Sequence, residues 1–159
     1  CGTGENAIFL ADRGHEVMGI DLAPQAIELA RIKAASRSVE VEFTVWDATK
    51  VPFAVRAFDT VLDSGLFHVF DAELKKRYVR FLGSVVRAGG RAHVIVWSEH
   101  EESKEGPSRV TQAELRQFFA PGWNDIKIQS GVYETSMHEH GARAWVASMR
   151  KRPDPASGE

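Results

Sequence analysis

A short glycine turn at the start of the chain constrains the fold more than any other feature. Gly2 and Gly4 are separated by one residue, and the apolar residues that follow at helical spacing predict a helix over 5–13. A strand-like run over 17–20 comes next and ends at Asp21. A glycine turn, a helix, a strand and an acid, in this order, are typical of α/β domains that bind the adenosine part of a cofactor. Such a turn normally follows a strand, so we expect that the first strand of the fold is missing from the chain.

The composition is that of an ordinary globular protein. The chain has 159 residues, of which 43% are hydrophobic and 26% are charged, and its net charge is −2. This charge predicts no binding of nucleic acid or membranes, and no apolar run approaches the ~20 residues of a membrane span. The lone cysteine, Cys1, favours a cytoplasmic setting. We predict one domain over 1–150 that lacks its N-terminal part, and a disordered tail over 151–159.

Helix and strand patterns alternate along the chain. Beyond the first helix, helices are predicted over 24–35, from the N-cap Asp71 to a stop at Gly89–Gly90, and over 111–119. Strands are predicted over 15–20, 39–45, 58–62, 92–97, 125–130 and 144–150. The last two strands have no helix between them, so we expect them to pair antiparallel. The order predicts the α/β class, with a doubly wound, mostly parallel sheet, a C-terminal antiparallel hairpin and a missing first strand.

Three acids follow three successive strands of this pattern. Asp21 closes the first, Asp47 follows the second, and Asp63 follows the third and opens the turn Asp63-Ser64-Gly65. Because the carboxyl ends of parallel strands meet at one edge of a sheet, this is where α/β domains bind ligands.

With these acids in place, the chain resembles the class I S-adenosylmethionine-dependent methyltransferases. Gly2 and Gly4 match the last two glycines of that family's cofactor turn, and the segment 58–63 matches its fourth strand and following loop. Within the family, the chain is most similar to the small-molecule branch that includes thiopurine and tellurite-resistance enzymes. The segment 106–111, followed by a helix, supports that branch.

The resemblance implies that S-adenosylmethionine is the cofactor and S-adenosylhomocysteine the product. Asp21 would accept hydrogen bonds from the ribose hydroxyls, and Asp47 would accept one from the adenine amino group. The full set of cofactor-binding residues predicted in this way is Cys1, Gly2, Thr3, Gly4, Asp21, Leu22, Trp46, Asp47, Ala48, Asp63, Ser64 and Gly65. Each acid also has a structural interpretation, since Asp21 could cap the helix that starts at Pro24.

The function that follows is methyl transfer to O, N or S of a small molecule. Methyl transfer from a sulfonium mainly requires alignment of the reactants. A base is needed only if the acceptor must lose a proton, and His68 is the candidate catalytic residue. His138 and His140 have no evident third ligand, so no metal is predicted.

Two alternatives stay open. Gly2, Gly4 and Ala7 also fit the glycine-x-glycine-x-x-alanine fingerprint of NAD(P)-dependent oxidoreductases. If the chain is complete as given, the absence of a central strand would predict a poorly folded, inactive fragment. The methyl acceptor and the oligomeric state cannot be inferred from the sequence.

Overall fold

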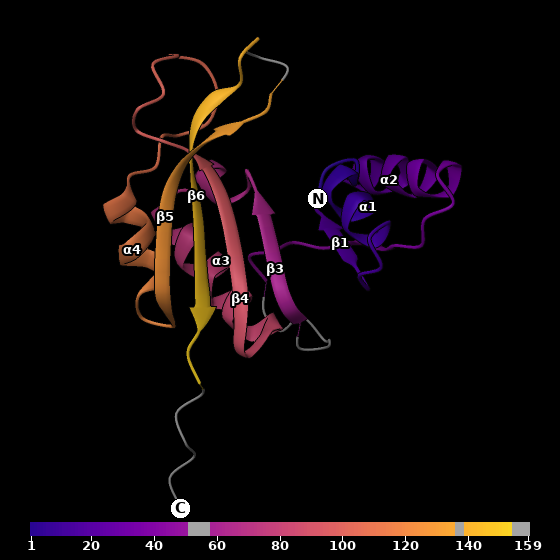
Figure 1. Ribbon diagram of the computed structural model, residues 1–159, viewed down its shortest axis with the longest axis horizontal. Coiled ribbons are helices and arrows are strands. Elements are labelled where there is room, and N and C mark those ends of the chain that lie inside the picture. Colours follow the sequence, from indigo (N-terminus) through magenta and orange to yellow (C-terminus); the bar gives the residue numbers. More distant parts are fainter. Residues whose placement is uncertain (51–57, 136–138, 154–159) are drawn as a thin grey trace, which may run out of the picture. The chain divides into compact units, whose positions relative to one another are not determined.

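The computed structural model describes residues 1–50, 58–135 and 139–153. It divides the chain into two compact units, residues 1–50 and residues 51–159, and Figure 1 labels the main elements of each. In the described part of the chain, no helix has the length and apolar character needed to cross a bilayer. The prediction of one domain over 1–150 stays a prediction.

The N-terminal unit contains two helices and a pair of parallel strands. Its elements are α1 (Glu5–Ala11), β1 (Met18–Asp21), α2 (Pro24–Ser36) and β2 (Glu42–Val45). In the parallel register Gly19 lies opposite Phe43, and Asp21 lies opposite Val45. The two carboxyl ends therefore lie side by side.

The ring of Phe43 packs against both the glycine turn and strand β1. Phe43 is buried with Ile8 and Ala30 in the core of the unit. A Cβ atom on Gly4 would lie 2.9 Å from the Phe43 ring, and one on Gly19 would lie 2.7 Å from it. Real Cβ atoms do not approach so closely, so both positions require glycine because of packing. Gly4 also has a φ of 85°, which favours glycine for conformational reasons.

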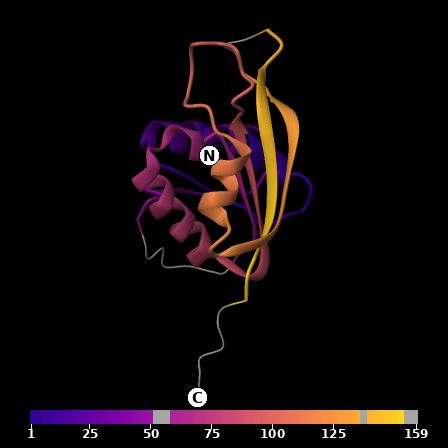
Figure 2. The same ribbon diagram turned by 90° about the vertical axis from the view of Figure 1, so that its left-hand side faces the viewer.

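The C-terminal unit is a four-stranded mixed sheet with helices. Its strands run in the order β3-β4-β6-β5; β3 and β4 are parallel, and the β5–β6 pair and the β4–β6 pair are antiparallel. Helices α3 and α4 lie on the same side of the sheet (Figure 2). The elements are β3 (Phe58–Ser64), the 3-10 helix η1 (Phe67–Val69), α3 (Ala72–Val85), β4 (Val86–Trp97), α4 (Gln112–Phe119), β5 (Trp123–Tyr133) and β6 (Ala142–Lys151).

The predicted α/β class and the C-terminal antiparallel hairpin are confirmed, with two differences in detail. Among the described residues, the strands pair as a two-stranded sheet in the N-terminal unit and a four-stranded sheet in the C-terminal unit. β4 begins at Val86, directly after α3, and the predicted stop at Gly89 is an irregular stretch in which the β3–β4 register shifts. The predicted tail begins too early, because β6 includes Lys151 and the Arg152 N–H donates to the Gly122 carbonyl at 3.0 Å. Residues 154–159 lie outside the described residues.

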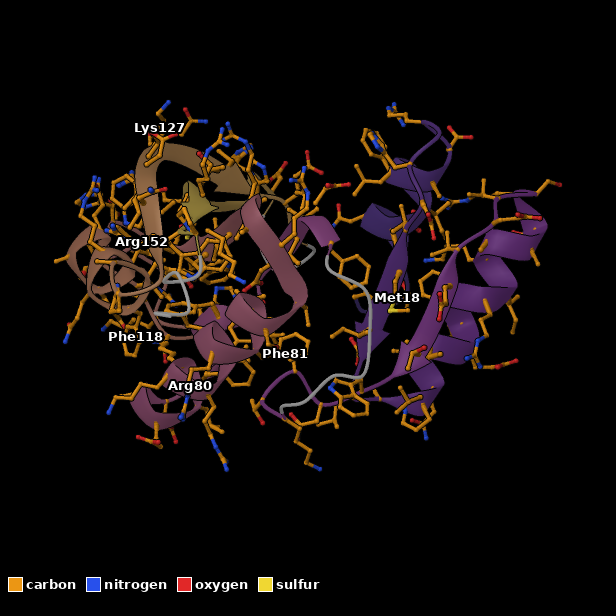
Figure 3. All side chains as sticks on the ribbon, turned by 90° about the horizontal axis from the view of Figure 1, so that it is seen from below. Met18, Arg80, Phe81, Phe118, Lys127 and Arg152 are labelled. Carbon is orange, nitrogen blue, oxygen red and sulfur yellow. The ribbon has the colours of Figure 1, made fainter. Side chains whose placement is uncertain are left out.

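An ion pair joins helices α3 and α4 of the C-terminal unit, and a charged side chain lies on its edge strand β5. The Thr111 hydroxyl caps α4 by accepting from the Glu114 N–H at 3.0 Å, as the capping-box pattern predicts. The Glu114 carboxylate instead pairs with the buried Lys75 ammonium of α3 at 2.7 Å, which joins the two helices. Lys127 projects from the outer strand β5 (Figure 3), and such a charged side chain disfavours pairing with another strand.

The turn after β3 is built around the carboxylate of Asp63. This side chain is 3% exposed. Its two oxygens accept from the Leu66 N–H at 2.7 Å and from the Phe67 N–H at 3.0 Å, and the Tyr78 hydroxyl is a third partner. Burial raises the pKa of Asp63 to about 6, although these three hydrogen bonds oppose the rise.

We therefore expect Asp63 to make stability depend on pH. Its folded-state pKa lies above the ordinary 3.8, so folding favours the protonated form. That contribution is complete below about pH 4 and is lost as the pH rises to about 6. Relative to Asp63→Asn, the wild type should lose up to about 3 kcal/mol of unfolding free energy over this range, measured by urea titration.

A matched control lies on the same strand. The Asp59 side chain is 80% exposed, so Asp59→Asn makes the same replacement of an acid by an amide without burial and is the matched control. A wild type that becomes more stable than Asp63→Asn as the pH rises from 4 to 6 would contradict the assignment, since it would show that the hydrogen bonds outweigh burial.

Candidate functional site

The carboxylate of Asp21 joins the glycine turn to the end of β1. One oxygen accepts from the Gly2 N–H at 2.7 Å and from the Cys1 nitrogen at 3.1 Å, and the other accepts from the Ala23 N–H at 2.9 Å. Partial burial raises the pKa of this carboxyl, but the hydrogen bonds from Ala23 and Gly2 together with the Cys1 ammonium outweigh it, so the pKa lies below its usual range. Asp21 is therefore an anion at neutral pH, with its side chain 24% exposed.

The second acid lies beside the first. The Trp46 N–H donates to the Asp21 carbonyl at 2.9 Å, which places the ends of β1 and β2 next to each other. One oxygen of Asp47 accepts from the Thr49 hydroxyl at 2.7 Å and from the Thr49 N–H at 2.9 Å. These two hydrogen bonds hold the pKa of Asp47 below its usual range. Ala48, which follows, is buried.

The remaining residues predicted in this unit divide between the surface and the core. Leu22, directly after Asp21, is 68% exposed and adds an apolar surface to the edge that carries the acids. Thr3 accepts a hydrogen bond from the Lys33 ammonium at 2.9 Å. Cys1 is a free cysteine whose side chain is 13% exposed. Gly4 is buried under Phe43, so its part is to shape the turn.

The N-terminal unit fits the adenosyl part of S-adenosylmethionine. Gly2 has a φ of 55°, and a Cβ atom there would meet nothing within 4 Å, so the space beside the turn is open. Asp21 and Asp47 present ionised, partly exposed oxygens that can accept further hydrogen bonds, with Leu22 as an apolar neighbour. That residues of this unit hold the ribose and the adenine stays a prediction.

The C-terminal unit contains the other predicted residues, Asp63, Ser64 and Gly65. A place for Asp63 at the reacting end of the cofactor stays a prediction, and its burial with hydrogen bonds from Leu66 and Phe67 weighs against it. Ser64 and Gly65 are half-buried at the top of that turn. Gly65 has a φ of 88°, and its N–H donates to the Ile95 carbonyl at 3.0 Å. Ser64 and Gly65 are thus more accessible than the buried Asp63 carboxylate.

His68 lies just past this turn and is buried. Its Nδ1 accepts from the Trp97 N–H at 3.1 Å, so the proton of the neutral ring is on Nε2. Burial, together with the positive charges of Lys75 and Arg109, lowers the pKa of His68 to about 4. The lone pair that a base would use is already occupied. A catalytic role for His68 stays a prediction, and the hydrogen bond from Trp97 weighs against it.

Two residues near His68 were missed by the sequence analysis. The Tyr133 ring centre lies 6.0 Å from that of His68, and the Tyr133 hydroxyl donates to the Ser64 carbonyl at 3.2 Å. The Arg109 guanidinium lies 4.8 Å above the Trp97 ring and donates to the carbonyls of nearby loop residues. No local pattern marks Tyr133, because it contacts a turn 69 residues away in the sequence, whereas Arg109 lies in the segment 106–111 that the resemblance already included.

A metal centre is not supported within the described ranges. Among these residues no three His, Cys, Asp or Glu side chains lie close enough to share an ion. His138, one of the two histidines considered from the sequence, lies outside the described residues.

Comparison with known proteins identifies the family of this chain. A family model described as a methyltransferase domain matches residues 1–90. A 2-heptyl-1-hydroxyquinolin-4(1H)-one methyltransferase of Mycobacteroides abscessus is 34% identical over 77% of this chain and 56% of its own length. A thiopurine S-methyltransferase of Pseudomonas putida is 30% identical over 82% of this chain and 67% of its own length. These relatives do not favour the oxidoreductase alternative.

The fold is shared with solved structures. A chain solved in work on the conversion of a disulfide bond into a thioacetal group during echinomycin biosynthesis aligns with a TM-score of 0.87 and 30% identity, over 99% of this chain and 76% of that one. The present chain spans about half the length of the first curated relatives, 56% and 43%. The glycine turn, the acids at the strand ends and these matches together show that the chain belongs to the class I S-adenosylmethionine-dependent methyltransferases.

Proposed function

We propose that this chain transfers a methyl group from S-adenosylmethionine to an O, N or S atom of a small molecule. The observation that carries the proposal is the pairing of the ionised, partly exposed Asp21 carboxylate with the open turn at Gly2. Two of the relatives are named for a hydroxyquinolinone and for thiopurines, which are planar heteroaromatic molecules. We therefore propose a planar heteroaromatic acceptor for this chain.

The N-terminal unit would bind the cofactor through complementary polar groups. Asp21 already accepts backbone N–H groups, and its remaining lone pairs would accept from the two ribose hydroxyls. Asp47 would accept from the adenine amino group, with Leu22 against the apolar face of the ring. Hydrogen bonds to an ionised acceptor are about twice as strong as neutral ones, which favours adenosyl ligands at this edge.

The C-terminal unit would align the acceptor. S-adenosylmethionine supplies a methyl group already activated by a positive sulfur, so the protein's part is to orient the nucleophile and exclude water. The Ser64–Gly65 turn is suited to this because its backbone is held by Asp63 from inside. His68, neutral and hydrogen-bonded to the Trp97 N–H, would support the turn without taking a proton. The acceptor would then bind as an anion or as an amine that needs no base.

Calorimetric titration of S-adenosylhomocysteine tests the cofactor site. Asp21→Ala should weaken binding by at least about tenfold, because the ribose hydroxyls lose an ionised acceptor. Asp21→Asn retains one acceptor oxygen and should give an intermediate affinity. Glu40→Gln removes an exposed acid of the same unit and serves as the control, with unchanged affinity. No binding by the wild type would refute the proposed function, and equal affinity in Asp21→Ala would refute the ribose role.

A pair of His68 variants separates a base from a structural residue. The side-chain oxygen of Asn can replace Nδ1 as the acceptor of the Trp97 N–H, but an amide cannot act as a base at neutral pH. We expect His68→Asn to retain methyl transfer within about threefold of the wild type and His68→Ala to lose about tenfold, because Ala leaves the buried N–H without its partner. The measurement is the initial rate of transfer to a hydroxyquinolinone or a thiopurine across pH 5 to 9. Equal loss in both variants, with an altered pH profile, would identify His68 as the base.

A further inference from the structure

Tyr133 makes a long-range contact with the turn that follows β3. It is the last residue of β5, which is the edge strand farthest from β3 in the sheet order β3-β4-β6-β5. Nevertheless its hydroxyl donates to the Ser64 carbonyl at 3.2 Å, across 69 residues of sequence. The end of the C-terminal hairpin therefore reaches over the carboxyl end of the sheet to β3.

The same hydroxyl lies directly against Gly65. A Cβ atom at Gly65 would lie 2.5 Å from the Tyr133 oxygen and 3.1 Å from the ring carbon that bears it. Gly65 also has a φ of 88°, a left-handed conformation that side chains disfavour. Glycine at position 65 is thus required for two reasons: it allows the left-handed backbone conformation, and it leaves room for the close approach of Tyr133.

The turn is consequently held on two sides. Asp63 accepts its backbone N–H groups from inside the unit, at Leu66 and Phe67. Tyr133 donates to its carbonyl at Ser64 and covers Gly65. Because Asp63 is 3% exposed whereas Tyr133 is only partly buried, the Tyr133 hydroxyl is the more accessible of the two contacts.

We propose that Tyr133 is a positioning residue for methyl transfer, which acts by fixing the Ser64–Gly65 turn that aligns the acceptor. This inference rests on the proposed function and adds a residue from the C-terminal hairpin. The Ser64 carbonyl can be solvated when the hydroxyl is removed, so the contact contributes little to stability. The hydrogen bond from Tyr133 instead fixes the position of the turn. Methyl transfer depends on the alignment of the reactants, so a small displacement of the turn would slow it.

The variant Tyr133→Phe tests the contact itself. It retains the ring beside His68 and removes only the hydroxyl. Hydrogen exchange followed by mass spectrometry should show faster exchange of the amides of residues 65–67 in the full chain, with the rest of the C-terminal unit unchanged. The control is Ser130→Ala, which removes an exposed hydroxyl from the same strand and should leave exchange at 65–67 as in the wild type. Unchanged exchange in Tyr133→Phe would overturn the proposal, whether or not the chain transfers methyl groups.

Steady-state kinetics with the same variants test the consequence. We expect Tyr133→Phe to lower kcat about tenfold, while KM for S-adenosylmethionine changes less than about twofold. Ser130→Ala should match the wild type in both constants. An unchanged kcat in Tyr133→Phe, or an equal change in KM and kcat with a lower melting temperature, would overturn the positioning role and leave Tyr133 a purely structural contact. A wild type that binds no S-adenosylhomocysteine refutes the proposed function instead, and the exchange experiment then still decides the contact.

Discussion

The acids that end the parallel strands organise the backbone that follows them, and the rest of the site depends on this interaction. Asp21 accepts from Gly2 and Ala23, and Asp47 accepts from Thr49. Asp63 does the same for its own turn. A carboxylate that accepts nearby N–H groups fixes a turn in a defined shape. The backbone that follows each strand is thereby held in one conformation, in which its exposed groups could contact a ligand.

The three acids differ in burial, and burial decides which of them can also face a ligand. The side chains of Asp21 and Asp47 are 24% and 26% exposed, and their low pKa values keep them ionised. Asp63 is 3% exposed, and burial raises its pKa. The first two therefore keep ionised, partly exposed oxygens beside the turns they hold, whereas the third is enclosed by its turn. The structural and functional interpretations of a strand-end acid are thus compatible in the N-terminal unit.

Two aromatic side chains show how distant parts of each unit shape its turn. In the N-terminal unit, Phe43 packs on Gly4 and Gly19, which explains why both positions lack a side chain. In the C-terminal unit, Tyr133 packs on Gly65 in the same way and adds a hydrogen bond. In both cases the glycine is visible in the sequence, while the ring that requires it comes from another strand.

The sequence by itself determined the α/β class, the order of the elements, the glycine turn and the acids at the strand ends. These features can be inferred from neighbouring residues. The spacing of apolar residues indicates a helix or a strand with one buried face, and glycine or proline marks the turns between them. Only the tertiary structure decided the burial of Asp63, the occupied Nδ1 of His68 and the contact of Tyr133 with Ser64. Those depend on strand order, register and side-chain direction, which bring together residues up to 69 positions apart and leave no local pattern.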